Sequence, residues 1–524
     1  MLKNLFITHP VLIKHAHEAD GPFTDAERGG HGDITLKRFL DAKHLIMLGV
    51  GGVIGAGIFV LTGTAAAQYA GPALIISFII AGATCALAAL CYAEFASMLP
   101  VSGGAYAYSY ATLGEMVAWF VGWNLVLEYM LACSTVAVGW SAYFNEMLHL
   151  LSGWIGVDLT LPGSFVSAPF SFNTDMHLVT TGALLNIPAI LIIAALSWLC
   201  YRGITQSATA NAVIVTIKVA VIVLFLVVTF HYIQPSLWHP FIPPNEGGTH
   251  YGWSGVIRGA SVVFFGYLGF DAISTAAGET KNPRRNMPIG ILGALLVCTI
   301  LYMSMSAALT GLAPFRNLNT AEPVATAINY VLSTVHMGST ARFVLKALKV
   351  IVVFGALAGL SSVVLVTLFA QSRIFYSMSQ DGLLPESISK LHGKSRTPYL
   401  STIFAGIVCA TLASLFPISV LGDMVSMGTL LAFAIVCLGV LVLRYTRPEL
   451  PRTFRVPMAG LICPLATAAC LFLFWRVFSQ RWWLFLGWTL IGLLIYGFYG
   501  YHHSKLRRSA SFRSRAPVIV KEIS

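Results

Sequence analysis

The sequence predicts an all-α membrane protein with about 12 transmembrane helices. Of its 524 residues, 57% are hydrophobic and only 10% are charged, and the mean hydropathy is +0.77. Soluble domains do not have this composition. Its apolar residues form long runs, and about 20 such residues cross a hydrocarbon core of about 30 Å as a helix. Because lipid offers the backbone no hydrogen-bond partner, runs of this length are expected to be helices rather than barrel strands.

Charge, proline and polar clusters separate the apolar runs from one another. The runs that we take as spans are residues 45–70, 73–99, 116–147, 179–200, 208–231, 254–277, 289–314, 345–376, 400–417, 424–445, 457–479 and 482–502.

The spans suggest a division of the chain into two halves and flanking segments. From the N-terminus we expect a loose cytoplasmic tail (1–34), an interfacial helix (35–44), a first five-helix repeat (45–231), a second five-helix repeat (254–445), two further helices (457–502) and a basic cytoplasmic tail (503–524). The apolar stretch at the N-terminus is interrupted by His9 and Pro10 and has no small-residue cleavage site, so we do not interpret it as a signal peptide.

The net charge of +11 is distributed as in a membrane protein and not as in a nucleic-acid-binding protein. If the N-terminus is inside, the inner segments hold 24 of the 32 lysines and arginines. This bias predicts that both termini are cytoplasmic. The basic tail, "KLRRSASFRSR", is expected to lie against anionic lipid, and a regulatory role for it stays open.

Neither a metal site nor a nucleotide site is indicated. All nine cysteines fall in or beside apolar runs without a CxxC pair, so we interpret them as small core residues. The phosphate-binding patterns GxGxxG and GxxxxGK[ST] do not occur. Most of the 14 histidines lie in tails and loops. We therefore expect no cofactor and no nucleic-acid partner.

Glycine clusters interrupt the first and the sixth span. They comprise Gly49, Gly51, Gly52, Gly55 and Gly57 in the first span, and Gly266 and Gly269 in the sixth. Each glycine costs a helix about 1 kcal/mol relative to alanine. These spans are the first members of the two halves, and broken helices in matching positions indicate a transporter's midplane binding site. Close packing through the GxxxG of Gly51 and Gly55 is the alternative, although it explains one cluster more easily than a pair.

Ionisable residues inside spans are expensive and are candidates for function. Lys218 lies deep in the fifth span, where burial disfavours the charged form and allows proton loss near physiological pH. A permanently paired structural lysine is the alternative. Glu128, at mid-depth in the third span, is either the counter-charge of Lys218 or a protonated carboxyl bonded to the backbone, and it is a candidate for a proton relay.

Three further carboxylates lie near breaks or span ends. Asp271 follows the glycines of the sixth span, and capping the inner half-helix is its simplest role, with gating or protonation as the alternative. Glu94 and Glu115 lie near the inner ends of the second and third spans, where solvated or structural roles are favoured.

Five segments, in the expected order over residues 35–500, resemble the bacterial, twelve-helix type of the cationic amino acid transporter branch of the amino acid, polyamine and organocation superfamily. They are "GVGGVIGAGIFVLTG", "GPALIISFIIAGATCALAALCYAEFASMLPVSGGAYAYSY", "GWNLVLEY", "FFGYLGFDAISTAAGETKNPRRNMPIGI" and "RIFYSMSQDGLLP". This resemblance implies an inverted five-plus-five repeat in which the first and sixth helices are unwound at the substrate.

The resemblance also implies a substrate site at the two breaks. Backbone N–H groups near Ala56 and Gly57 would hold a carboxylate at the start of the outer half-helix. Released carbonyls would accept from an ammonium, and Phe265 would close over the substrate from outside. Many relatives have a serine where this chain has Ala56, so here only backbone groups can hold the carboxylate. The full set is Val53, Ile54, Gly55, Ala56, Gly57, Phe265, Gly266, Leu268 and Gly269.

Lys218 matches the position at which proton-driven relatives carry a lysine in place of a sodium ion. The resemblance implies that its ammonium reaches a first-helix carbonyl such as that of Gly51, opposite Ser361 and Ser362 of the eighth span. Loss of the proton would then loosen the first helix from the fifth. Eukaryotic members often lack this lysine, so we expect a bacterial plasma-membrane protein.

The sequence therefore predicts a secondary active transporter, most simply a proton symporter of small or broad-range neutral amino acids that works by alternating access. A carrier of lysine and arginine, an exchanger and a uniporter stay open, and so do protein partners. A membrane enzyme is disfavoured because no catalytic triad, metal cluster or phosphate loop is recognisable. A signalling receptor would need large soluble domains or another span count.

Overall fold

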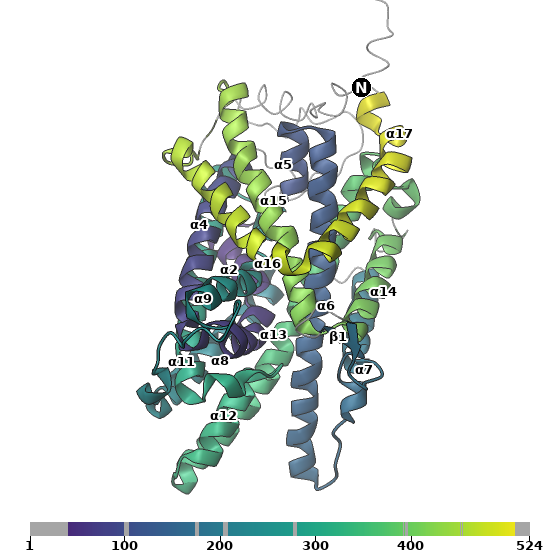
Figure 1. Cartoon of the computed structure of the whole chain (residues 1–524). Helices are drawn as coiled ribbons and strands as arrows, with labels where there is room; N and C mark the ends of the chain where they lie inside the picture. The colour runs from purple at the N-terminus through teal and green to yellow at the C-terminus, as the bar shows by residue number, and fades with distance from the viewer. Residues whose placement is uncertain are drawn as a thin grey trace, which may run out of the picture.

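The computed structural model is a bundle of long helices that pack side by side (Figure 1). It describes residues 40–98, 104–172, 178–202, 208–275, 280–390, 392, 397–450, 452 and 454–508. The predicted N-terminal tail, most of the predicted interfacial helix and the end of the basic tail lie outside these residues. The all-α membrane fold is confirmed, whereas the boundaries of the two five-helix repeats stay a prediction.

The helices follow the predicted spans in order. In the first half they are α2 (Ala42–Val53), η2 (Gly57–Leu61), α3 (Thr62–Ala65), η3 (Ala66–Ala70), η4 (Gly71–Ala73), α4 (Leu74–Met98), α5 (Gly104–Thr112), α6 (Glu115–Ile155), α7 (Ile187–Tyr201) and α8 (Ala208–Thr229). In the second half they are α9 (Gly252–Val263), η8 (Phe264–Tyr267), α10 (Ala272–Thr275), α11 (Pro283–Leu312), α12 (Pro323–Thr334), α13 (Ser339–Gln380), α14 (Tyr399–Leu415) and α15 (Ile418–Thr446). The chain ends in α16 (Ala459–Ile495), η12 (Tyr496–Gly500) and α17 (Tyr501–His503).

Several predicted boundaries differ from the structure for local reasons. Helix α2 begins at Ala42, inside the segment expected to be interfacial, because Asp41 caps it and accepts from the His44 N–H at 3.0 Å. A short hairpin of β1 (Phe170–Phe172) and β2 (Leu178–Thr180) precedes α7, which is shorter than predicted. The last two predicted spans join into α16, which bends at Arg481 (φ −129°, ψ 21°).

Within the described residues, seven helical stretches are long and apolar enough to cross a membrane by themselves. Three shorter apolar helices, α2, α7 and α14, lie in the predicted first, fourth and ninth spans, and the predicted sixth span consists of α9, η8 and α10. Seven is fewer than the twelve predicted spans for two reasons. Breaks make some spans too short to be counted by length, and other neighbouring spans are joined into one helix, as in α16. The protein is thus a multi-pass membrane protein.

The helices pack in two groups. The first, second, sixth and seventh spans lie together, because α4 packs against α9 and α11, and α11 packs against α2. The third, fourth, eighth and ninth spans form the other group, in which α6 lies along α13 and both contact α7 and α14. Figure 1 shows α6 as a long central helix with α7 and α14 beside it. The first and sixth spans therefore lie beside α6 and α13, at the boundary between the two groups of helices.

Glu94 and Glu115 are buried and structural. Glu94 binds Arg444 (Oε1 to Nε 3.1 Å) and accepts from the Val456 N–H at 2.7 Å. Glu115 is fully buried and binds the Nε of Arg507 at 2.6 Å, so the base of the basic tail is held by the protein rather than by lipid. Of the two roles expected for these carboxylates, the structural one is confirmed and the solvated one is wrong.

A buried ion pair joins α9 to α15. The Nη2 of Arg258 lies 2.7 Å from Oδ1 of Asp423, and their side chains are 1% and 6% exposed. Arg258 also donates from Nε to Gln480 at 3.1 Å, and the Nε of Arg481 lies 3.5 Å from the second carboxylate oxygen. One acidic group thus lies between two arginines, and both members of the Arg258–Asp423 pair are buried.

We expect Asp423→Asn to destabilise the protein by roughly 3–5 kcal/mol, because it leaves Arg258 charged, buried and without its counter-ion. The measurement is the midpoint of thermal unfolding in detergent. Glu246→Gln is the control. Glu246 pairs with Arg316, and both side chains are exposed, so loss of this ion pair should leave the unfolding midpoint unchanged. Equal midpoints for the two variants would contradict the role assigned to Asp423.

Candidate functional site

The first span is broken at Ile54 and Gly55. Helix α2 ends at Val53, and Ile54 turns to an extended conformation (φ −73°, ψ 99°) while its N–H still bonds Val50 O at 2.9 Å. The next backbone bonds run from Ile58 and Phe59 to Gly55 O, both at 3.2 Å. The N–H groups just before Ile58 therefore stand at the open start of the outer half-helix.

The sixth span is broken at the matching place. Its outer part ends in the 3₁₀ turn η8, Leu268 is extended (φ −57°, ψ 141°), and Gly269 has a φ of +107°. That left-handed conformation favours glycine, so the chain can redirect there without strain. The short α10 continues the span after Asp271, as the sequence predicts.

The two breaks touch each other through their backbones. A Cβ built on Gly57 would lie 2.3 Å from Gly266 Cα, and one on Gly269 would lie 2.7 Å from the carbonyl carbon of Gly52. No side chain fits between these segments. Close packing and unwinding, the two interpretations of the glycine clusters, therefore both apply, because the unwound stretches are the ones that pack closely.

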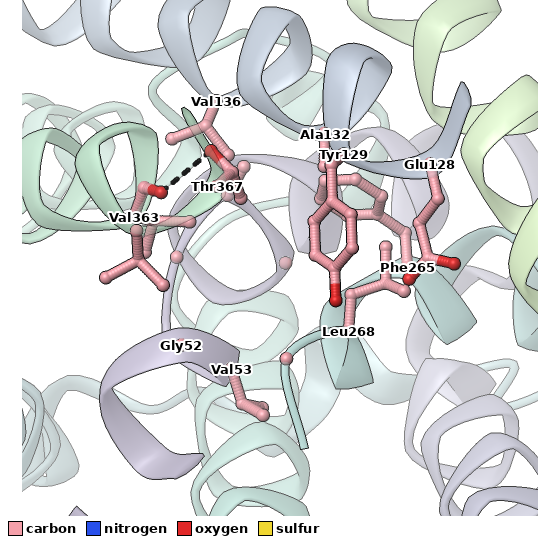
Figure 2. A pocket seen from close by; sticks show the side chains of 15 residues that line it. Gly52, Val53, Glu128, Tyr129, Ala132, Val136, Phe265, Leu268, Val363 and Thr367 are labelled. Atoms are coloured by element: carbon pink, nitrogen blue, oxygen red, sulfur yellow. Dashed lines mark hydrogen bonds between the residues drawn. The ribbon is translucent and has the colours of Figure 1, made fainter. Parts of the chain in front are cut away.

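A small cavity of about 40 Å³ lies beside the breaks (Figure 2). Its lining comprises Gly52, Val53, Gly55, Ala56, Gly57, Glu128, Tyr129, Ala132, Val136, Phe265, Leu268, Gly269, Val363, Val366 and Thr367. All predicted substrate residues except Ile54 and Gly266 are among them. The volume admits a few water molecules, so the cavity must enlarge before a substrate of the predicted kind fits.

Residues of α6 and α13 that the sequence did not single out complete the lining. Ala132 and Val136 follow Glu128 at intervals of four, the spacing that places side chains on one helix face. This periodicity was the available signal on α6. No comparable marker exists on α13, where Thr367 donates its hydroxyl to Val363 O at 2.9 Å and leaves an apolar surface toward the cavity.

Lys218 of α8 is buried and holds the first break. Its Nζ donates to Gly51 O at 3.0 Å and to Ile54 O at 3.1 Å. Its side chain packs on Gly359 of α13, where a built Cβ would come within 3.3 Å of the lysine Cε. One ammonium therefore bonds the first span on both sides of Val53.

The hydroxyls of Ser361 and Ser362 donate within their own helix, α13. The hydroxyl of Ser361 donates to Leu357 O at 2.7 Å and accepts from the indole of Trp140 at 2.9 Å, and Ser362 donates to Gly359 O at 3.0 Å. The structure thus gives Lys218 two backbone partners on the first span, with Gly359 as its neighbour on α13.

Glu128 and Asp271 lie near the cavity without pairing with Lys218 in the described part of the chain. Glu128 is 1% exposed and lines the cavity, and its Oε2 has no hydrogen-bond partner among the described residues. The carboxylate of Asp271 accepts from the Gly269 N–H at 3.3 Å and from the Tyr129 hydroxyl at 3.2 Å. Figure 2 shows Glu128 and Tyr129 together, away from Val136 and Val363.

The family model and the similar proteins that match this chain agree with one another. The family model described as amino acid permease matches residues 40–498. The chain is 43% identical to the methylthioribose transporter of Bacillus subtilis (strain 168) over 90% of this chain and 96% of the relative. It is 44% identical to the branched-chain amino acid permease BcaP of the same organism, over 91% and 96%. To the vacuolar cationic amino acid transporter 4 of Arabidopsis thaliana it is 38% identical, over 79% and 64%.

Proposed function

From the premise that the chain belongs to the amino acid permease family, we propose that it is a symporter that carries small or broad-range neutral amino acids together with a proton by alternating access. The relatives named above are transporters or permeases, so the chain is a transporter and not an enzyme. We place it in a bacterial plasma membrane with both termini in the cytoplasm, on the distribution of its lysines and arginines.

The observation that carries the substrate proposal is the lining opposite the breaks. Ala132, Val136 and Val363 present small and branched aliphatic groups from α6 and α13. An aliphatic substrate side chain gains free energy there by leaving water, whereas a charged one would lose hydration. The name of the branched-chain permease relatives agrees with this choice.

The two ends of the amino acid backbone would be held at the breaks. The open N–H groups at Ala56 and Gly57 and the positive end of the outer half-helix attract a carboxylate. Carbonyl oxygens near Val53 and Leu268 would accept from the ammonium. Phe265, buried and in the lining, is the residue that would close over the substrate, and Asp271 would act with it as a gate.

Lys218 would couple proton movement to the first span. Protonated, its ammonium ties α8 to Gly51 O and Ile54 O; deprotonated, it would lose donors and loosen that tie. Glu128 would exchange the proton between the protein and the cavity. Ser361 and Ser362 lie in α13, close to Gly359, against which the lysine side chain packs.

A carrier of lysine or arginine is the second candidate, and Glu128 is the observation that favours it. An unpartnered carboxylate oxygen beside the cavity would suit a cationic side chain. Plant relatives named cationic amino acid transporters are 34–38% identical to this chain. Obligatory exchange of amino acids also fits the geometry, because alternating access requires no particular driving ion.

Reconstituted protein should show saturable uptake of radiolabelled leucine and alanine that an inwardly directed proton gradient stimulates. A competition panel separates the candidates: valine, leucine and alanine should compete, whereas arginine, lysine and methylthioribose should compete at least about tenfold less well, because burying an unneeded charge or sugar is costly. Empty liposomes are the control. Competition by arginine alone would favour the cationic carrier, and absence of any amino acid uptake would refute the family-based proposal.

A further inference from the structure

A second hollow, a groove of about 580 Å³, lies between α7 and α14, which run side by side (Figure 1). It shares no lining residue with the cavity at the breaks. Two of its lining side chains, Trp198 and Ile407, are 52% and 63% exposed, so the groove opens on the outer surface of the bundle. At its floor the helices touch, because a Cβ built on Gly406 would lie 2.4 Å from Ser197 Oγ.

Both ends of the groove are fixed by hydrogen bonds. At one end the N–H of Asn186, just before α7, bonds Ser414 O at 3.4 Å. At the other end the hydroxyl of Thr397 donates to Tyr201 O at 3.2 Å. The walls are thus tied together above and below the groove, so its shape is set by the packing of the two helices.

The dimensions of the groove suit hydrocarbon chains and not a further helix. Along α7 it runs from Ile190 to Tyr201, which is about 17 Å of helix, so its volume corresponds to a mean cross-section of about 34 Å². A helix with its side chains is 10–12 Å wide and needs about 80 Å² or more. A hydrocarbon chain is only about 4 Å wide, the contact distance of its carbons, so one or two chains fit.

The length and the walls agree with a lipid chain. About 17 Å is slightly more than half of a hydrocarbon core of about 30 Å, which is the depth of one leaflet. The wall side chains include Ile190, Ala194, Ile403, Ile407 and Ala410. Because these groups already face hydrocarbon in a membrane, a chain gains no free energy there by leaving water. It gains close contacts on several sides in place of contacts on one.

One end of the groove carries positive charge. Arg202 follows α7 and is exposed, and its guanidinium lies 4.3 Å from the ring centroid of Trp198. Exposed Lys390 follows η11 (Glu386–Ser389), a turn that packs against α14 and adds one acid, Glu386. Tryptophan is favoured where the membrane meets water, so Trp198 indicates the depth of the lipid headgroups. A basic surface at this depth attracts anionic headgroups.

We propose that the groove between α7 and α14 binds an anionic phospholipid, with acyl chain along the two helices and headgroup at Arg202. The site is separate from the transport cavity and adds a lipid ligand to the amino acid and the proton of the proposed function. Both walls belong to the same group of helices, the one formed with α6 and α13. Binding of the lipid should therefore not depend on whether leucine is present.

The headgroup is tested by native mass spectrometry of the purified protein, titrated with phosphatidylglycerol and with phosphatidylcholine of the same two acyl chains. The anionic lipid should bind about fivefold more tightly, the effect of one arginine at a membrane surface. Arg202→Gln should reduce its affinity to that of phosphatidylcholine. Arg284→Gln is the control, since Arg284 is an exposed arginine in the first turn of α11, and it should leave both affinities unchanged.

The groove is tested by two phenylalanine substitutions on α7. Ala194 and Ala195 are adjacent and both exposed, but Ala194 lines the groove and Ala195 does not. Ala194→Phe should weaken the binding of both lipids about tenfold, because its ring takes the space of the chain. Ala195→Phe places the same ring beside the groove and should change neither affinity.

Equal affinity of the two lipids for the unmodified protein would overturn the proposal, and this measurement does not depend on the folding of any variant. Equal weakening by Ala194→Phe and Ala195→Phe would show unspecific lipid around the bundle, and displacement of the lipid by leucine would place it in the transport cavity; either result would overturn the proposal. Absence of amino acid uptake would refute the proposed function and leave the lipid measurements unaffected.

Discussion

Replacing Gly57 with alanine should reduce transport by about 100-fold or more, because catalytic and transport sites tolerate displacements of about 1 Å poorly. The new Cβ would lie 2.3 Å from Gly266 Cα, a separation that real Cβ atoms do not show. The obstacle is backbone and cannot rotate away. The two breaks must separate, and with them the N–H groups, the carbonyls and Phe265 that surround the cavity.

The measurement is initial uptake of radiolabelled leucine per folded molecule, with folding checked by size-exclusion chromatography. Gly422→Ala is the matched control: this glycine lies in α15, and the nearest side-chain atom to its built Cβ is 3.8 Å away. Gly266→Ala should have an intermediate effect, because its closest contacts would be 3.3 Å. Transport by Gly57→Ala within about twofold of the unmodified protein would show that the two backbones can part without consequence.

Lys218→Ala should abolish accumulation of amino acid driven by a proton gradient. The substitution removes the group proposed to take up the proton and leaves Gly51 O and Ile54 O without their donor. We expect exchange of labelled for unlabelled substrate at equal pH on both sides to persist at a reduced rate, since the cavity lining itself is intact. The two assays, run on the same liposomes, separate loss of coupling from loss of binding.

Lys218→Arg tests the proton assignment from the opposite direction. Arginine keeps the positive charge and the donors but does not release a proton at any pH of interest. It should therefore preserve the tie to the first span and still fail to accumulate substrate against a gradient. Undiminished pH-driven uptake in either lysine variant would remove Lys218 from the coupling mechanism.

The breaks were predictable from the sequence because their causes are local. The glycines of the first span, Gly269 with its positive φ and the neighbouring Asp271 mark positions where a helix is weak, whatever surrounds it. Lys218 was conspicuous for a similar reason, since one charge in a long apolar run has few explanations. The kink at Arg481 likewise lies where the last two predicted spans adjoin.

The partners of these residues could not be predicted, because they depend on how distant helices pack. The sequence offered Ile54 and Gly266 as substrate contacts, whereas the structure directs their carbonyls to Lys218 and Tyr302. It left open whether Glu128 neutralises Lys218, and the two lie in separate networks in the described residues. Val363 and Tyr302 carry no local mark at all, since an aliphatic or aromatic residue in a membrane span is the ordinary case.

The contact between Glu115 and Arg507 has a consequence for biosynthesis. The two residues are 392 positions apart in the chain, so the carboxylate is made long before its partner leaves the ribosome. Until then the carboxylate at the start of α6 lacks its arginine partner. Synthesis of the segment that contains Arg507 would thus complete this contact. Prematurely terminated chains lacking Arg507 should accordingly be selected for degradation, although every membrane span is already present in them.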